Sequence, residues 1–288
     1  MARRCRLTGG DAVSYGDHVT NGYHHDRVLA NGIYHHVASC GDGPPLLLLH
    51  GWPHTWFVWH RVAPLLARHH RVIIPDLRGL GESDRSAAGY DLDTLAGDAA
   101  AVLDAFGARD AAVVAMDLGV AVAWMLAARH RLRVRALVLM EGLVGRLPGA
   151  EQFLANGPPW WWGFHAAAPA LAETVLAGNF AAYVGWFLRD LTDETARETF
   201  LHAYRDNLGL AHYRAMPGNA ALVAATDPPT DVPTLAISGG VVGDALAGQL
   251  APISRALTTA RIPHCGHVIP LDQPDALAAC ISPFIAPR

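Results

Sequence analysis

The chain alternates short apolar runs with longer stretches of helical periodicity. The runs at 45–50 and 71–75 lack polar alternation, which is typical of strands buried on both faces of a sheet. The stretch at 92–106 repeats its apolar residues at helical spacing instead. Strands that alternate with helices predict an α/β fold whose mostly parallel sheet is covered by helices on both faces. Further strands are expected at 28–30 and 33–38 (a hairpin), 113–116, 134–140, 233–238 and 256–262, and further helices at 55–68, 118–129 and 270–280.

The pattern changes between residues 146 and 226, where helical periodicity dominates and aromatic residues cluster. We therefore expect an α/β core at 26–145 and 227–288 that is interrupted by a helical cap at 146–226. Such an insertion could cover the carboxyl-terminal edge of the sheet, where folds of this kind bind ligands. Residues 1–25 are polar and rich in Gly and His, which predicts a loose amino-terminal extension.

Composition and charge exclude several classes of function. A net charge of −4 over 288 residues gives no reason to expect nucleic acid or an anionic membrane as a partner. All 22 basic residues are Arg, which excludes a Schiff-base lysine and a P-loop lysine. The four scattered cysteines suit a reducing cytoplasm, and no stretch has the pattern of a signal peptide or a bilayer span. The 16 histidines form no complete metal-binding set, so no metal or other cofactor is expected.

The candidate chemistry centres on Asp117. An apolar run ends at Met116, Asp117 follows, and helical spacing begins at once. A strand–turn–helix corner strains its apical residue, so the residues two positions away must be small, as Ala115 and Gly119 are. A carboxylate at the apex can attack an electrophilic carbon and form an ester. Alternatively, Asp117 is only the N-cap of the helix that follows.

Two further groups follow later strands. Glu141 comes directly after the strand predicted at 134–140, and His267 lies in Cys265-Gly266-His267 after the last strand. With Asp117 they follow the order nucleophile, acid, histidine, which is one of the known chain orders of a catalytic triad.

On these residues the chain resembles the α/β-hydrolase family over roughly residues 25–288. It is most similar to the branch with an aspartate nucleophile, which comprises epoxide hydrolases and dehalogenases. The resemblance implies a mostly parallel eight-stranded sheet with an inserted helical cap. The motifs that carry it are His50-Gly51-Trp52-Pro53, the loop from Asp76 to Asp84, Met116-Asp117-Leu118-Gly119, His212-Tyr213-Arg214 and Gly266-His267.

The resemblance implies a two-step hydrolysis. Asp117 would attack a substrate carbon and form an alkyl-enzyme ester, and His267 would then activate a water that attacks the ester carbonyl. Backbone N–H groups of Trp52 and Leu118 would hold the oxyanion.

The acid that orients His267 has two candidates. The family usually carries it after the strand that ends at Ser238, where Gly240 fills the usual position and Asp244 comes late. Some dehalogenases and relatives place it one strand after the nucleophile, where Glu141 stands. We favour Glu141 and keep Asp244 as the alternative.

The cap residues bear on the leaving group. In epoxide hydrolases two cap tyrosines hold the epoxide oxygen. Tyr213 matches one of them, and Trp162 falls at the other, where an indole N–H can polarise the oxygen without giving up its proton. Arginines typical of haloacid dehalogenases are absent, since Leu118 and Ala121 stand at those positions. The resemblance therefore favours an epoxide.

Aromatic cap residues also suggest the substrate. If Trp161, Trp186 and Phe187 line the pocket, they favour a large, flat, apolar epoxide, because aromatic side chains bury much area and stack. The partner expected is therefore a small molecule, with a homodimer left open. Two alternatives remain: a dehalogenase with the same Asp–His machinery, and a non-catalytic or biosynthetic accessory protein on this scaffold.

Overall fold

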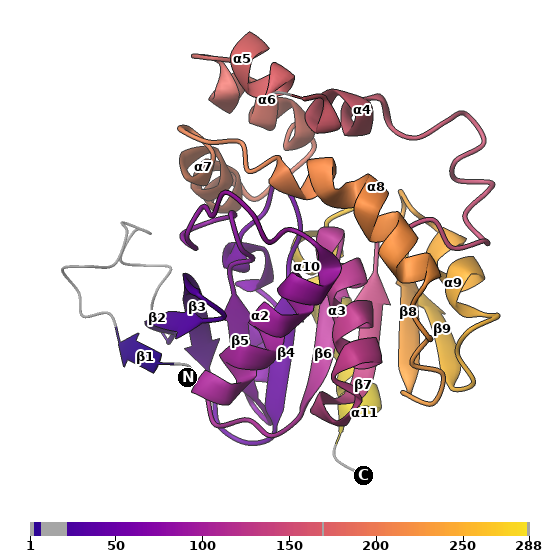
Figure 1. Cartoon of the computed structure of the whole chain (residues 1–288). Helices are drawn as coiled ribbons and strands as arrows, with labels where there is room; N and C mark the ends of the chain where they lie inside the picture. Colours follow the sequence, from indigo (N-terminus) through magenta and orange to yellow (C-terminus); the bar gives the residue numbers. More distant parts are fainter. Residues whose placement is uncertain (1–2, 7–21, 169, 287–288) are drawn as a thin grey trace.

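The computed structural model describes residues 3–6, 22–168 and 170–286 and contains one central sheet. Its strands are β1 (Arg3–Arg6), β2 (His24–Ala30), β3 (Ile33–Cys40), β4 (Pro45–Leu49), β5 (Arg71–Pro75), β6 (Ala111–Met116), β7 (Val134–Met140), β8 (Thr234–Ser238) and β9 (Leu257–Arg261). They lie in the order β1-β2-β3-β5-β4-β6-β7-β8-β9 (Figure 1). From β5 to β9 all neighbours are parallel, whereas the pairs β1–β2, β2–β3 and β3–β5 are antiparallel. The expected eight-stranded, mostly parallel sheet is thus present as β2 to β9.

The ninth strand corrects one expectation. Part of the segment predicted to be a loose extension, Arg3–Arg6, pairs with β2 as the antiparallel edge strand β1. The open edge of β2 offers unpaired backbone groups, and four residues suffice to occupy them. Residues 7–21 of that extension lie outside the described part of the chain.

Helices cover both faces of the sheet. Figure 1 shows α2 (Leu92–Ala105) and α3 (Leu118–Arg129) in front of it and α11 (Pro274–Ile285) behind it. Every residue of β6 is buried, as an apolar strand between two helical layers must be. The remaining helices of this core are η1 (Trp56–Trp59), α1 (Ala63–Leu66), η2 (Arg131–Arg133), α9 (Ala245–Leu250) and α10 (Ile269–Asp272).

Two of the expected helices are shorter and broken. The helix predicted at 55–68 is divided into η1 and α1, and the Thr55 side chain caps η1 by accepting a hydrogen bond from Phe57 N. The helix predicted at 270–280 is divided into α10 and α11 at Gln273. Gln273 precedes a proline, and that position disfavours the helical conformation.

The segment between β7 and β8, for which we predicted a cap at 146–226, carries five helices. They are α4 (Trp160–Ala166), α5 (Leu171–Val175), α6 (Phe180–Phe187), α7 (Glu194–Ala203) and α8 (Ala211–Ala224). Figure 1 shows α4, α5 and α6 beyond the carboxyl ends of the parallel strands, with α8 crossing that edge. Side chains from this segment can therefore face the residues that end β4, β6 and β7.

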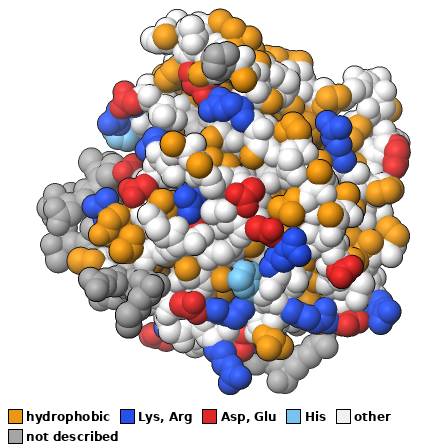
Figure 2. All heavy atoms as spheres, viewed as in Figure 1, with side chains coloured by type: hydrophobic (Ala, Val, Ile, Leu, Met, Phe, Trp, Pro, Cys, Tyr) orange, Lys and Arg blue, Asp and Glu red, His pale blue; other side chains and the backbone are white. Residues whose placement is uncertain are grey.

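Charges of both signs are interspersed on the face that carries α2 and α3 (Figure 2). Several are paired, such as Arg129 with Asp93 at 2.7 Å and Arg131 with Asp231 at 2.7 Å. This face therefore presents no patch of a single sign. None of the described helices combines the length and the apolar composition that crossing a bilayer requires.

Candidate active site

The corner between β6 and α3 holds Asp117 in a strained backbone conformation. Its φ of 52° and ψ of −126° lie where residues with a side chain are rarely found. A Cβ on Gly119 would lie 2.7 Å from His50 O, and a Cβ on Gly51 would overlap the Asp117 carboxylate. The Asp117 side chain makes no capping hydrogen bond to α3. The N-cap alternative is therefore excluded, and the carboxylate faces the turn after β4.

Both carboxylate oxygens of Asp117 have partners. Oδ1 accepts a hydrogen bond from Trp52 N at 2.9 Å, and the backbone N–H of Leu118 also bonds to the carboxylate. Oδ2 lies 3.1 Å from His267 Nε2. The side chains of Asp117 and His267 are 21% and 28% exposed, so a small molecule can reach both. Four of the residues predicted for catalysis and for the oxyanion hole therefore meet at one point.

Glu141 stands behind the imidazole. Its Oε2 lies 3.4 Å from His267 Nδ1, close enough for an ion pair but without the alignment of a hydrogen bond. The buried Glu141 carboxylate accepts hydrogen bonds from Gly239 N at 2.8 Å, Val242 N at 2.9 Å and Val241 N at 3.3 Å. The loop after β8 thus holds the acid in place with its backbone instead of supplying an acid of its own.

Asp244, the alternative acid, is engaged elsewhere. Its Oδ1 accepts hydrogen bonds from Ser238 Oγ at 2.9 Å and from Arg261 Nη2 at 2.8 Å. The Asp244 side chain is 77% exposed. The structure therefore brings Glu141, and not Asp244, to the far nitrogen of His267.

Asp117, His267 and Glu141 each favour the charged form of the neighbouring side chain. Burial is the largest single influence on Asp117 and disfavours its ionised form, but the hydrogen bond with His267, the charge of that imidazole and the Leu118 N–H together outweigh burial and hold the pKa of Asp117 below its ordinary value. Burial also opposes a charged His267, yet its contacts with Asp117 and Glu141 raise the pKa of His267 to about 10. The pKa of Glu141 is lowered against burial by His267 and by the backbone N–H groups of the loop. At neutral pH an ionised carboxylate therefore lies beside an imidazolium.

Aromatic side chains from the predicted cap pack against Trp52. The Trp52 ring lies 4.8 Å from the Phe187 ring and 5.7 Å from the Tyr213 ring, measured between centroids. Tyr213 is 3% exposed. Trp161 packs against Phe187 at 5.5 Å, whereas Trp186 is 44% exposed and carries the Arg189 guanidinium 4.2 Å above its ring. Of the three predicted wall residues, Phe187 thus reaches the site, Trp161 lies behind it and Trp186 lies at the surface.

The role predicted for the Trp162 indole stays a prediction, and the structure brings another side chain into ring contact with Trp52 and Tyr213. Trp162 is half-buried, and no ring contact found in the described part of the chain joins it to Trp52 or Tyr213. His165 lies there instead, with its ring centroid 4.4 Å from Tyr213 and 4.8 Å from Trp52. His165 is fully buried, its Nε2 lies 2.7 Å from the Tyr183 hydroxyl, and its Nδ1 has no protein partner among the described residues.

The sequence analysis does not predict a role for His165, although its spacing from Trp162 is a signal that could have indicated one. It follows Trp162 by three positions in α4, so both residues lie on the same face of the helix, one turn apart. A polar ring at helical spacing within an aromatic cluster marks a side chain that needs a buried partner.

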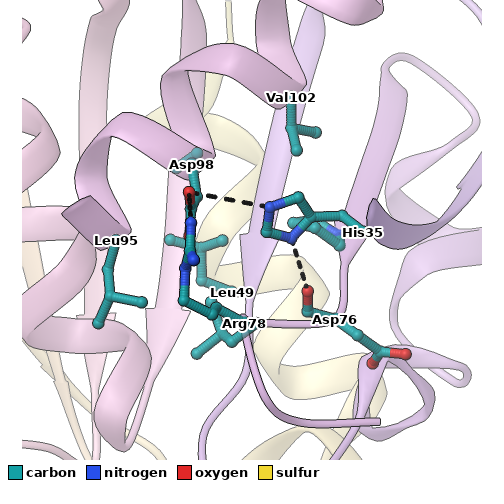
Figure 3. A pocket seen from close by; sticks show the side chains of 10 residues that line it. His35, Leu49, Asp76, Arg78, Leu95, Asp98 and Val102 are labelled. Carbon is teal, nitrogen blue, oxygen red and sulfur yellow. Dashed lines mark hydrogen bonds and ion pairs between the residues drawn. The ribbon is translucent and has the colours of Figure 1, made fainter. Parts of the chain in front are cut away.

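A loop of the core sets the position of Tyr213. Arg78 donates two hydrogen bonds to Asp98, at 2.8 Å and 2.7 Å, in the small buried pocket of Figure 3, where His35 also faces Asp98. The Arg78 carbonyl accepts a hydrogen bond from His212 Nε2 at 2.8 Å. Because His212 directly precedes Tyr213, this anchor ties α8 to the core beside the candidate site. The pocket itself contains none of the predicted site residues.

The described residues contain no group of three or more His, Cys, Asp or Glu side chains that could hold a metal ion.

Comparison with known proteins supports the resemblance. Residues 44–274 match the family model described as the alpha/beta hydrolase fold. The chain is 27% identical to the soluble epoxide hydrolase of Corynebacterium sp. (strain C12) over 285 residues, which cover 91% of this chain and 97% of that protein. It is 38% identical to epoxide hydrolase B of Mycobacterium tuberculosis over a shorter stretch of 118 residues, which covers 38% of this chain and 33% of that protein.

Solved structures agree over most of the chain. Cfl2 from Burkholderia cenocepacia superposes with a TM-score of 0.83 at 32% identity and covers 92% of this chain and 96% of its own. The epoxide hydrolase CorEH superposes with a TM-score of 0.79 at 25% identity, over 90% of this chain and 97% of its own. The chain belongs to the α/β-hydrolase fold family, and over most of its length it is similar to epoxide hydrolases.

Proposed function

We propose that the protein is an epoxide hydrolase that acts through a covalent ester on Asp117. The observation that carries the proposal is the Asp117 carboxylate, whose Oδ1 accepts from Trp52 N while its Oδ2 faces His267 Nε2. An ionised carboxylate in a partly exposed position, held by N–H donors and flanked by a histidine–acid pair, is suited to attack on carbon followed by hydrolysis.

In the first step Asp117 attacks a ring carbon of the epoxide. One carboxylate oxygen forms a bond to that carbon while the C–O bond of the ring breaks and leaves its electron pair on oxygen. Tyr213 and His165 contact Trp52 and each other, and they are the candidate donors to that oxygen. His165 takes the place that the sequence assigned to Trp162.

In the second step His267 becomes the base. Ester formation removes the negative charge of Asp117, which is a main reason that the pKa of His267 is raised. Burial then favours the neutral ring, so His267 releases its proton to solvent and the imidazole can take a proton from water, with Glu141 stabilising the imidazolium that forms. That water attacks the ester carbonyl, and the N–H groups of Trp52 and Leu118 stabilise the oxyanion.

The substrate that fits is an apolar or aromatic epoxide. Phe187 and Tyr213 make edge-to-face contacts with the ring of Trp52, whose backbone N–H holds the nucleophile. Aromatic walls favour flat, apolar groups, since those groups gain both burial and stacking.

A single turnover in heavy-oxygen water tests the proposal on a panel of aryl epoxides. We expect the first diol to carry no label and Asp117 to carry it, because water attacks the carboxyl carbon of the ester. Label in the first diol with none in Asp117 would overturn the covalent route. Halide release from matched haloalkanes, with no diol from any epoxide, would instead identify a dehalogenase.

A further inference from the structure

Tyr183 on α6 is the only residue in the described part of the chain that is hydrogen-bonded to the His165 side chain. The Tyr183 hydroxyl lies 2.7 Å from His165 Nε2, and the two rings meet nearly edge to face at 72°. The other ring nitrogen, Nδ1, is buried without a protein partner, and the ring faces Tyr213 and Trp52. One side of this imidazole is therefore fixed by the protein, and the other side is left for a ligand.

The tautomer of His165 follows from this contact. Burial lowers the pKa of His165 to about 4, so the ring is neutral near pH 7 and carries one N–H. A phenol is the stronger acid of the two groups, and a separation of 2.7 Å is typical of a hydroxyl donor. Tyr183 thus donates to Nε2, and the single proton of His165 lies on Nδ1. An Nδ1–H without a protein acceptor is satisfied by a ligand oxygen, as buried polar groups require.

We propose that Tyr183 is a positioning residue that fixes His165 in the Nδ1–H tautomer and replaces the proton that His165 gives to the epoxide oxygen. This inference rests on the epoxide hydrolase function proposed above. In this scheme Tyr183 supplies the ring-opening proton through His165, without touching the substrate itself.

The step balances in atoms and charge. As the epoxide C–O bond breaks, the His165 Nδ1–H bond breaks and an O–H bond forms on the departing oxygen. At the same time the Tyr183 O–H bond breaks and a bond from Nε2 to that proton forms. His165 is neutral before and after, and the charge that leaves Asp117 ends on the Tyr183 phenolate.

Tyr183 suits this task better than Tyr213. Tyr213 is 3% exposed, and burial raises its pKa well above the ordinary value of a phenol. Tyr183 is partly exposed, and burial raises its pKa only to about 12. Its phenolate therefore costs less to form and can recover a proton from solvent between turnovers. Tyr213 remains as the second hydrogen-bond donor to the oxygen.

The test is rapid-quench mass spectrometry of ester formation in Tyr183→Phe. The variant keeps the ring and removes only the hydroxyl, so we expect ester formation to slow by about tenfold to a hundredfold while ester hydrolysis stays within about twofold. The matched control is Tyr23→Phe. The hydroxyl that it removes lies away from the site and donates a hydrogen bond of 3.0 Å to His60 O. Ester formation at the wild-type rate in Tyr183→Phe would overturn the inference.

Two further measurements separate a proton role from a packing role. Nitrogen NMR of the His165 ring should show Nδ1–H in the wild-type protein and a mixture of tautomers in Tyr183→Phe. In a His165→Phe background, Tyr183→Phe should cause no additional loss, because the hydroxyl acts only through the imidazole. Additive losses, or an unchanged tautomer, would contradict the inference.

Failure of this inference differs from failure of the proposed function. If wild-type protein forms the Asp117 ester but Tyr183→Phe forms it equally fast, only the role of Tyr183 is lost. If no ester forms on Asp117 in the wild-type protein with any aryl epoxide, the proposed function itself fails.

Discussion

The site has a core half and a cap half, and the two are built in different ways. In the core half, Trp52, Asp117, Glu141 and His267 each follow a strand and meet at one edge of a parallel sheet. In the cap half, the groups project from helices that pack through aromatic rings, as His165 does against Tyr213. Strand register fixes the first set to within a residue, because a shift by one position moves a side chain to the opposite face. The positions of the cap residues depend instead on how each helix is rotated about its axis and on how it packs.

The two halves of the site also differ in charge. The core half holds an ionised carboxylate beside an imidazolium and a second carboxylate. The cap half is neutral, with the pKa of His165 lowered to about 4 and the pKa of Tyr183 raised to about 12. An ionised nucleophile in the core half and neutral proton donors in the cap half are what ring opening by a carboxylate requires. The predictions below separate the two halves.

The largest expected effect concerns the core half. His267→Gln leaves Asp117 as a nucleophile but removes the base, so the ester should form and then persist with hydrolysis slowed about a thousandfold or more. Intact-protein mass spectrometry should show an adduct of one substrate mass. Asp117→Asn is the matched control and should form no adduct at all. A His267→Gln protein that turns over without an adduct would show that the core half does not work through an ester.

A smaller effect distinguishes the two acids. Glu141→Gln removes the charge that stabilises the His267 imidazolium and should lower kcat by about a hundredfold to a thousandfold. Asp244→Asn breaks only an exposed contact with Arg261 and should leave kcat within about twofold. Urea unfolding of both variants controls for the three backbone hydrogen bonds that Glu141 accepts. Equal losses of kcat at equal stability would contradict the assignment of Glu141.

The sequence could predict the core half because its constraints are local. An acid between two small residues at a strand–helix corner requires the backbone that Asp117 adopts, and a Cβ at Gly119 would indeed meet His50 O. Glu141 could be placed because it directly follows a clear strand, and the structure shows it at the far nitrogen of His267. Most strands were also predicted to within about two residues, since buried strands carry unbroken apolar runs.

The cap half could not be predicted as well, because packing decides which side of a helix faces the site. Trp162 and His165 lie one turn apart on α4, and the sequence alone does not show which turn meets Tyr213. The position of Tyr213 depends in turn on His212, which bonds to the Arg78 carbonyl in a loop 134 residues earlier. Contacts of that sequence separation leave no local pattern.

The cap half is tested by comparing three side chains. His165→Gln and Tyr213→Phe should each slow ester formation, by about a hundredfold for the first, which loses the proton donor, and about tenfold for the second, which loses a hydrogen bond to the epoxide oxygen. Trp162→Phe should change the rate by less than about threefold, since Trp162 has no ring contact with Trp52 or Tyr213. A loss in Trp162→Phe larger than that in His165→Gln would restore the original assignment of the second donor.

The smallest expected effect is on stability. The core half should lose stability as the pH rises, and the cap half should lose stability as the pH falls. The pKa of His267 is raised to about 10, so its contribution to folding is complete below pH 6.5 and is lost as the pH rises toward 10. The pKa of His165 is lowered to about 4, so protonation of the unfolded chain favours unfolding as the pH falls from 6.5 toward 4.

Urea unfolding at pH 5, 7 and 9.5 measures both losses of stability, with each effect roughly 1 kcal/mol after allowing for solvent screening. His267→Gln should reduce the alkaline loss only in part, because the raised pKa of the buried Cys40 thiol, about 11, adds to that loss, and it should leave the acid loss unchanged. His165→Gln should reduce the acid loss only in part, because the pKa values of His54 and His212 are lowered as well. If His267→Gln keeps the full alkaline loss, the core half does not hold the imidazolium on which the two-step scheme depends.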